Sequence, residues 1–148
     1  MKLVIQRVKR ASCVVEGQMI AQIKQGLLVF VGVVDEDGDD DIAYAVRKLA
    51  NMRLFSDEND KMNLSVKAIS DGQILSISQF TLFAATKKGN RPSFDAAGHP
   101  DFAHRIYDQF NQALAQEIPT QTGQFAADMQ IEAVNDGPVT IILDTKNR

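Results

Sequence analysis

Cysteine, histidine and long hydrophobic runs are scarce in this sequence of 148 residues. The single cysteine, Cys13, cannot form an internal disulfide, which excludes a disulfide-stapled secreted scaffold and fits a reducing compartment. No apolar run approaches the ~20 residues that span a bilayer, and the longest, 27–34, has the length of a strand. The N-terminal residues lack the apolar core of a signal peptide. We therefore expect a cytoplasmic protein with no membrane partner.

Only two histidines are present, His99 and His104, so conventional acid–base chemistry is poorly supplied. Their spacing is not that of a zinc-binding helix, and no cysteine pair can complete a metal site. The sequence has neither a Gly-x-Ser-x-Gly elbow nor a phosphate-binding loop, and nothing places a histidine beside a serine or Cys13. We expect His99 at the cap of a helix that Pro100 opens, Cys13 as a small buried hydrophobe, and no metal or cofactor.

The net charge of −3 conceals an uneven distribution. Six of the 19 acidic residues lie between Asp35 and Asp41, where they suit the cap and first turn of a helix and need not bind a metal. The remaining chain is mildly basic, and Lys87, Lys88 and Arg91 form a cluster that could face a phosphate backbone. Charge alone favours a solvated surface with an acidic loop, so it does not decide the partner.

Hydrophobic periodicity predicts a single α+β domain spanning residues 1–148. We expect an antiparallel-rich sheet or partial β-barrel with two main helices packed on it. The expected strands are 2–10, 12–16, 19–23, 27–34, 73–83, 125–133 and 139–143, and the expected helices run from Asp39 to about Met52 and from Pro100 to before Pro119. Turns are expected at 16–18, 71–72 and 135–138, and a polar loop at 87–92.

Two segments carry polar residues where an apolar strand would be ordinary. In the first, Ser78, Gln79 and Thr81 interrupt the expected strand 73–83. The second is 135–140, which includes a Gly-Pro pair. Taken singly, the first favours a half-solvated strand and the second an ordinary turn with a trans peptide bond.

Taken together, these segments resemble the D-aminoacyl-tRNA deacylase family. The resemblance rests on Ser-Gln-Phe-Thr-Leu at 78–82 and on Asn-x-Gly-Pro-Val-Thr at 135–140. It extends to 4–8, 62–64, 88–94 and 122–125, in the order of the family and over essentially the whole chain. Each motif is moderately specific, whereas all of them in register are strongly so.

The resemblance implies an editing hydrolase that cleaves the ester between a D-amino acid and the 3′-terminal adenosine of tRNA. It implies a cytoplasmic homodimer that needs no cofactor and whose site is formed across the subunits. Gly137-Pro138 would be a cis pair that one subunit inserts into the pocket of the other, where its carbonyl groups occupy the space of an L side chain. Glycine has no side chain to clash, so glycine mischarged on alanine tRNA is a further expected substrate.

The same resemblance assigns the reacting site to 78–81. An aminoacyl ester is already activated and the 2′-hydroxyl of the ribose can assist water, so positioning and backbone N–H donors would supply much of the catalysis. Phe80 would also offer a face to the terminal adenine. The predicted site residues are Ser78, Gln79, Phe80 and Thr81 as catalytic segment, Gly137 and Pro138 as chiral filter, Arg7 bracing the Gly137 carbonyl, Met129 lining the pocket, and Lys87, Lys88 and Arg91 contacting tRNA phosphates.

Two other functions are compatible with parts of the pattern. A non-catalytic module that captures tRNA ends would share the basic clusters and Phe80 but would not need the Gly-Pro segment. A small-molecule esterase or amidase would need a catalytic triad that the sequence does not supply. The expected partner is the 3′ end of aminoacyl-tRNA, and DNA is not an expected partner.

Overall fold

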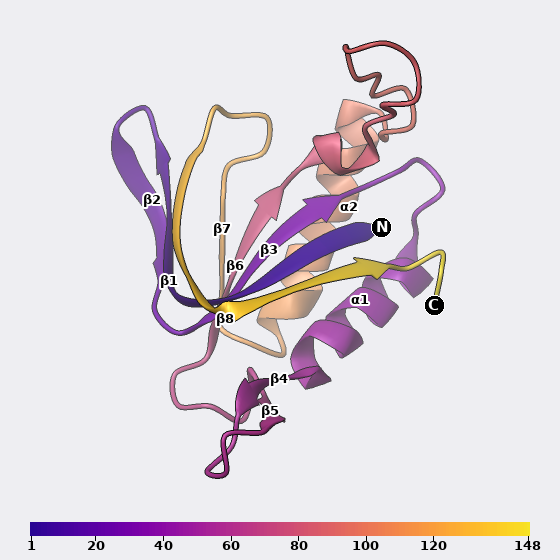
Figure 1. Cartoon of the computed structure of the whole chain (residues 1–148). Coiled ribbons are helices and arrows are strands. Elements are labelled where there is room, and N and C mark those ends of the chain that lie inside the picture. Colours follow the sequence, from indigo (N-terminus) through magenta and orange to yellow (C-terminus); the bar gives the residue numbers. More distant parts are fainter.

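The computed structural model describes residues 1–148 without a gap, and Figure 1 shows its elements. In chain order they are β1 (Lys2–Val15), β2 (Gln18–Ile23), β3 (Gly26–Gly32), α1 (Asp39–Asn51), β4 (Arg53–Ser56), β5 (Met62–Ser65), β6 (Gln73–Ser78), the 3₁₀ turn η1 (Phe80–Phe83), α2 (Pro100–Ala115), β7 (Thr120–Thr122) and β8 (Gln130–Asp144). None of the helices combines the length and the hydropathy needed to cross a membrane.

The main sheet is organised around β1. Its strand order is β2-β1-β3-β6-β7, and β8 pairs with β1 in addition. Residues 2–8 of β1 pair antiparallel with β3, residues 11–15 pair with β2, and β8 follows β1 along nearly its whole length. The β3–β6 and β6–β7 pairs are parallel. The long strands curve strongly, so the sheet is nearly closed like a barrel (Figure 1), which confirms the predicted α+β class.

Both helices form where the sequence predicts them, because each carries one apolar stripe. Gly38 caps α1, and the Asp41 carboxylate accepts the Gly38 N–H at 3.1 Å. Pro100 opens α2, with His99 at the cap position as expected, although the imidazole itself caps nothing. The helices and the sheet face they cover enclose a core cluster of 22 buried residues, against nine in the second cluster. Cys13 is fully buried in the second cluster, as predicted.

The predicted strand 73–83 is wrong in its second half. β6 ends at Ser78, the chain then turns into η1, and Val31–Ser78 is the last pair between β3 and β6. The N–H of Gln79 donates to the Val31 carbonyl at 2.8 Å, which is the last hydrogen bond between this segment and β3. Because β3 itself ends at Gly32, residues 80–83 have no strand to pair with. The same apolar-polar alternation therefore continues as a 3₁₀ turn.

The C-terminal prediction is wrong in a related way. Residues 125–129 form a turn rather than a strand, with Ala126 at φ +60°, and β8 begins only at Gln130. β8 then continues through 135–138, where we expected a turn, because its pairing with β1 resumes after register shifts around Val8. Likewise, 2–10 and 12–16 are one strand, β1. The short strands β4, β5 and β7 were not predicted.

Four charged groups and one hydroxyl at one end of the sheet form what we call the terminal cluster: Met1, Asp37, Asp41, Lys146 and Thr145. The α-ammonium of Met1 donates to the carboxylate of Asp37 and, at 2.7 Å, to the Thr145 hydroxyl. The Thr145 hydroxyl donates to Asp41 at 2.6 Å, and the Lys146 ammonium donates to Asp41 at 2.7 Å. The cluster joins the first strand, the start of α1 and the segment after β8.

Candidate active site

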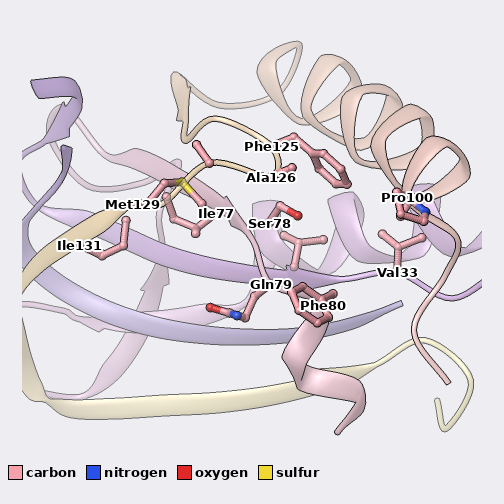
Figure 2. Close-up of a pocket in the computed structure, with 13 residues that line it drawn as sticks. Val33, Ile77, Ser78, Gln79, Phe80, Pro100, Phe125, Ala126, Met129 and Ile131 are labelled. Atoms are coloured by element: carbon pink, nitrogen blue, oxygen red, sulfur yellow. The ribbon is translucent and has the colours of Figure 1, made fainter. Parts of the chain in front are cut away.

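A cavity of about 510 Å³ opens where the parallel strands β3 and β6 end. Thirteen residues line it, ten of them hydrophobic: Val31, Val33, Ile77, Ser78, Gln79, Phe80, Pro100, Ala103, Phe125, Ala126, Ala127, Met129 and Ile131. In Figure 2, Ser78, Gln79 and Phe80 follow one another along one side, and Phe125 and Ala126 lie opposite. Because the carboxyl ends of parallel strands share one edge, the predicted segment 78–80 meets the start of α2 there.

Three of the four predicted catalytic residues line this cavity, and the fourth is attached to it. Thr81 is exposed in η1, where its hydroxyl oxygen accepts a hydrogen bond from the Gln79 side-chain amide at 2.6 Å. The backbone N–H of Gln79 is used by Val31, so it is not free to stabilise an oxyanion. The N–H groups of Phe80 and Thr81 open the 3₁₀ turn, where the turn itself offers them no acceptor.

Gly32 and Phe83 fix the turn on the sheet. The Phe83 ring lies so close to Gly32 that a Cβ added there would be 2.9 Å from a ring carbon, and 3.2 Å from the Gln79 carbonyl oxygen. The ammonium of Lys2, a residue of β1, lies 4.9 Å from the centroid of the Phe83 ring. Only a residue without a side chain at position 32 lets η1 approach the sheet this closely.

The opposite wall is held by aromatic residues of α2 that sequence reasoning missed. The Phe125 ring stacks on His104 at 4.4 Å and 5° between planes, and tilts against Tyr107 at 6.1 Å. The Tyr107 hydroxyl donates to the Ser76 carbonyl at 2.8 Å, and the Gly123 N–H donates to the same oxygen at 2.9 Å. Burial raises the pKa of Tyr107, partly opposed by its hydrogen bonds, so the hydroxyl stays a neutral donor. The available signal in the sequence was Ser76, a polar residue between the apolar Leu75 and Ile77.

Met129 lines the cavity, as the sequence predicts. The sulfur reaches toward Ile77 in Figure 2, and a Cβ added to Gly123 would meet that sulfur at 2.6 Å. Met129 and Phe125 belong to the turn before β8, not to a strand, and this turn is what brings both side chains to the cavity.

Gly137 and Pro138 do not line this cavity. Their peptide bond is cis, both residues are exposed on β8, and Gly137 has φ +125°. Arg7 lies beneath them, but its Nε donates to the carbonyl of Asp136 at 3.0 Å, and its Nη1 to the carbonyl of Leu54 at 2.6 Å. The predicted contact with the Gly137 carbonyl is therefore wrong by one residue, because β8 turns the Asp136 carbonyl toward β1.

The segment 84–99 projects beyond the ends of β3 and β6 and carries the predicted basic residues (Figure 1). Lys87, Lys88 and Arg91 are all exposed near its tip. At its far end, Asp35 accepts the His99 N–H at 2.8 Å, and its other oxygen lies 2.5 Å from the imidazole Nδ1. These hydrogen bonds, the backbone one foremost, lower the pKa of Asp35. His99 thus attaches the end of this segment to Asp35. No group of three or more His, Cys, Asp or Glu side chains is placed to hold a metal.

Comparison with solved structures shows which known proteins share this fold. A solved structure described as "c-Myc DNA Unwinding Element Binding Protein" is similar over 97% of this chain and 98% of that one, with 40% identity and a TM-score of 0.91. Another, described as "Structural Analysis of a probable eukaryotic D-amino acid tRNA deacylase", matches over 96% and 97% with a TM-score of 0.80. At 16% identity the second shows the shared fold alone.

The family follows from the sequence. Residues 4–144 match the model of the family described as D-Tyr-tRNA(Tyr) deacylase. This match spans nearly the whole chain, and the chain belongs to the D-Tyr-tRNA(Tyr) deacylase family, whose activity is hydrolysis of the aminoacyl-tRNA ester bond.

Proposed function

We propose that this protein frees tRNA from D-amino acids, and from glycine mischarged on alanine tRNA, and rejects L-aminoacyl-tRNA by a clash with main chain. The observation that carries the proposal is the cavity at the end of β6, where Ser78, Gln79 and Phe80 meet an apolar wall. Its volume of about 510 Å³ lies within the range of small-molecule sites, so it suits the adenosine and aminoacyl group at the tRNA 3′ end.

Catalysis in this proposal needs no side-chain base. The ester is bound so that water attacks with help from the 2′-hydroxyl of the terminal ribose. Negative charge then develops on the carbonyl oxygen, and the N–H groups of Phe80 and Thr81 are the candidate donors for it. Gln79 contributes its side chain, because its own N–H is bonded to Val31. The lack of a histidine beside Ser78 or Thr81 is consistent with this scheme, which uses no cofactor.

The chiral filter requires a second copy of the chain. Gly137 and Pro138 are exposed and do not line the cavity of their own protomer, which supports a homodimer in which β8 of one copy reaches the cavity of the other. Arg7 fixes the main chain just before the pair through the Asp136 carbonyl, and the ion pair with Asp136 at 3.4 Å adds to this. Discrimination then arises from a clash against the wrong enantiomer, and the D side chain itself is not read.

The basic tip of segment 84–99 gives the tRNA its approach. Lys87, Lys88 and Arg91 form no ion pair within the chain, so their charge is available to phosphates of the acceptor stem in the cytoplasm. The rate constant kcat/KM should then fall as salt rises from low to physiological concentration. A flat salt response would remove these residues from the interface.

The decisive experiment incubates the pure protein with D-tyrosyl-tRNA and L-tyrosyl-tRNA, each with and without a chelator. Release of the D form only, unchanged by chelator, supports the proposal. No release favours a module that merely binds tRNA ends, and equal release of both forms removes the filter. Because one similar structure is described by a DNA element, a single-stranded DNA of equal length serves as competitor, and we expect it to compete poorly.

The filter has its own test in Gly137→Ala. The new Cβ would lie 2.8 Å from the Arg7 Nη2, and φ +125° strains any L residue, so the main chain must shift. We expect discrimination between D and L substrates to fall at least ten-fold. Gly17→Ala is the control, because Gly17 also has positive φ (+76°) but nothing lies within 4 Å of its added Cβ. Unchanged discrimination in Gly137→Ala would contradict the assignment of the filter.

A further inference from the structure

A second aromatic ring lies outside the cavity, against the first. The Phe94 ring packs edge-to-face on Phe80, with 5.2 Å between centroids and 74° between planes. Phe94 does not line the cavity. Phe80 is 56% exposed and Phe94 is 37% exposed, so each ring leaves a surface free to a ligand. Adjacent exposed aromatic rings at the edge of a cavity are typical of a surface that binds a partner or ligand.

The segment that carries Phe94 is braced. Ala85 and Ser93 form an antiparallel bridge with two hydrogen bonds of 2.8 and 3.0 Å. The Ser93 hydroxyl donates to the Asp95 carboxylate at 2.6 Å, so the acidic residue next to Phe94 in the sequence already has a hydrogen-bond partner. The bridge closes a loop whose tip bears three cations without ion-pair partners, and these are Lys87, Lys88 and Arg91. The exposed Phe94 ring and the three cations are therefore carried by one braced segment.

This combination is the one that single-stranded nucleic acid recognises: bases stack on aromatic faces while cations follow the backbone. An apolar protein partner would not need the cations, and a small apolar ligand would enter the cavity instead. Resting on the proposed function, we propose that Phe94 stacks the unpaired nucleotide that precedes the terminal adenosine of tRNA. Phe80 and Phe94 then form two successive base platforms at the mouth of the site.

The angle between the rings gives the subsite a purpose. Bases stacked on planes 74° apart cannot stack on each other, so the strand must bend between the two nucleotides. The bend turns the terminal adenosine away from the acceptor stem and into the cavity that Phe80 borders. Phe94 is thus a specificity determinant for a nucleic-acid substrate, in contrast to a free aminoacyl ester.

The test compares two substrates with the full-length protein: D-tyrosyl-tRNA and 3′-D-tyrosyl-adenosine, which keeps the terminal adenosine and none of the remaining tRNA. Phe94→Leu keeps apolar packing against Phe80 but removes the stacking face. We expect KM for D-tyrosyl-tRNA to rise roughly ten-fold, since stacking one base contributes about this factor or more to binding affinity. The kinetics on the adenosine ester should stay unchanged. Phe102→Leu is the matched control, a partly buried phenylalanine on α2 that does not line the cavity.

A tRNA with an abasic site before the terminal adenosine completes the test. The wild type should lose about as much on it as Phe94→Leu loses on intact tRNA, and the variant should lose nothing more. Equal losses on both esters would overturn the inference, because Phe94 would then act only by holding Phe80. So would an abasic tRNA that serves as well as an intact one. Failure of the wild type on both esters would instead refute the proposed function itself, and this inference with it.

Discussion

Two groups of polar residues near the N-terminal part of β1, the terminal cluster and the residues at the end of β6, differ in how their hydrogen bonds are satisfied. In the terminal cluster, every charged group has a partner of opposite sign or a hydroxyl, and Asp37 and Asp41 are buried. At the cavity, Ser78 is half-buried without a hydrogen bond from its hydroxyl, and the side chains of Gln79 and Thr81 bond only to each other. One set of groups is satisfied internally, and the other retains capacity for something outside the chain.

The difference separates stability from function. Buried charges that complete one another hold elements together, and removing one leaves the others without a partner. Polar side chains with unused bonding capacity beside a cavity contribute little to folding, but they are available to a substrate. Substitutions in the terminal cluster should therefore change the free energy of unfolding, and substitutions around η1 should change kinetics.

The largest effect is expected from Asp41→Ala in the terminal cluster. It leaves the Thr145 hydroxyl and the Lys146 ammonium without their acceptor. Removing one partner of a fully buried ion pair costs about 3–5 kcal/mol, and we expect no more than the lower end, because the Lys146 side chain is 43% exposed and keeps Asp37 at 3.3 Å. Urea unfolding measures the change, and kcat per folded molecule should be unaltered. Asp40→Ala, exposed in the same first turn, should cost well under half as much. Equal costs would place the stability elsewhere.

Gly32→Ala should have the next largest effect, and on the opposite quantity. The new Cβ would press on the Phe83 ring at 2.9 Å and on the Gln79 carbonyl at 3.2 Å, which displaces η1. A displacement of about 1 Å in a positioning element costs about 100-fold in rate. We expect that loss in kcat/KM with a smaller change in unfolding, and partial recovery when Phe83→Leu is added.

Gly38→Ala is the control for Gly32→Ala, because nothing lies within 4 Å of the added Cβ at position 38. Its kcat/KM should equal that of the wild type. If Gly32→Ala were as active as this control, the close approach of Phe83 would have no part in positioning the turn.

Acid should weaken the terminal cluster by somewhat less. Burial acts to raise the pKa of Asp41, but hydrogen bonds from Lys146, Thr145 and the Gly38 N–H outweigh it and lower the pKa from 3.8 to about 2. A carboxyl with a depressed pKa stabilises the fold above its unfolded pKa and loses that contribution as pH falls through the folded one. Between pH 5 and pH 2, the wild type should lose about 2 kcal/mol more than Asp41→Asn. Parallel pH profiles in urea unfolding would contradict this.

Much of the fold follows from local patterns in the sequence. The apolar stripes of α1 and α2 need only their own spacing and a capping residue, and both helices lie where they are predicted. The strands failed where pairing decides. Residues 79–83 and 125–129 alternate like strands, yet β3 ends too early to pair with the first, and the second turns at Ala126. A partner strand that is absent leaves no trace in the segment itself.

The site divides in the same manner. Ser78, Gln79 and Phe80, which the motif at 78–82 marks, line the cavity, and so does Met129, which was expected to line the pocket. The support from α2 could not be predicted: Tyr107 reads as one more member of an apolar stripe, and its bond to the Ser76 carbonyl is made across 31 residues. The bond from Arg7 to Asp136 rather than Gly137 depends on the register of β8, which the sequence does not specify.

The smallest effect is expected from Thr81→Val, and it tests the kinetic side of the comparison at its centre. The Thr81 hydroxyl accepts a bond from the Gln79 amide at 2.6 Å and has no histidine or carboxylate bonded to it, so nothing is placed to remove its proton. A threonine without a base is a weak nucleophile. We expect kcat to fall only a few-fold, as the Gln79 amide loses its acceptor, and we expect Thr81→Ser to match the wild type. A nucleophile would behave differently, since valine would then abolish turnover by several thousand-fold while serine retained it, and that pattern alone would return the chemistry from the substrate's own hydroxyl to the protein.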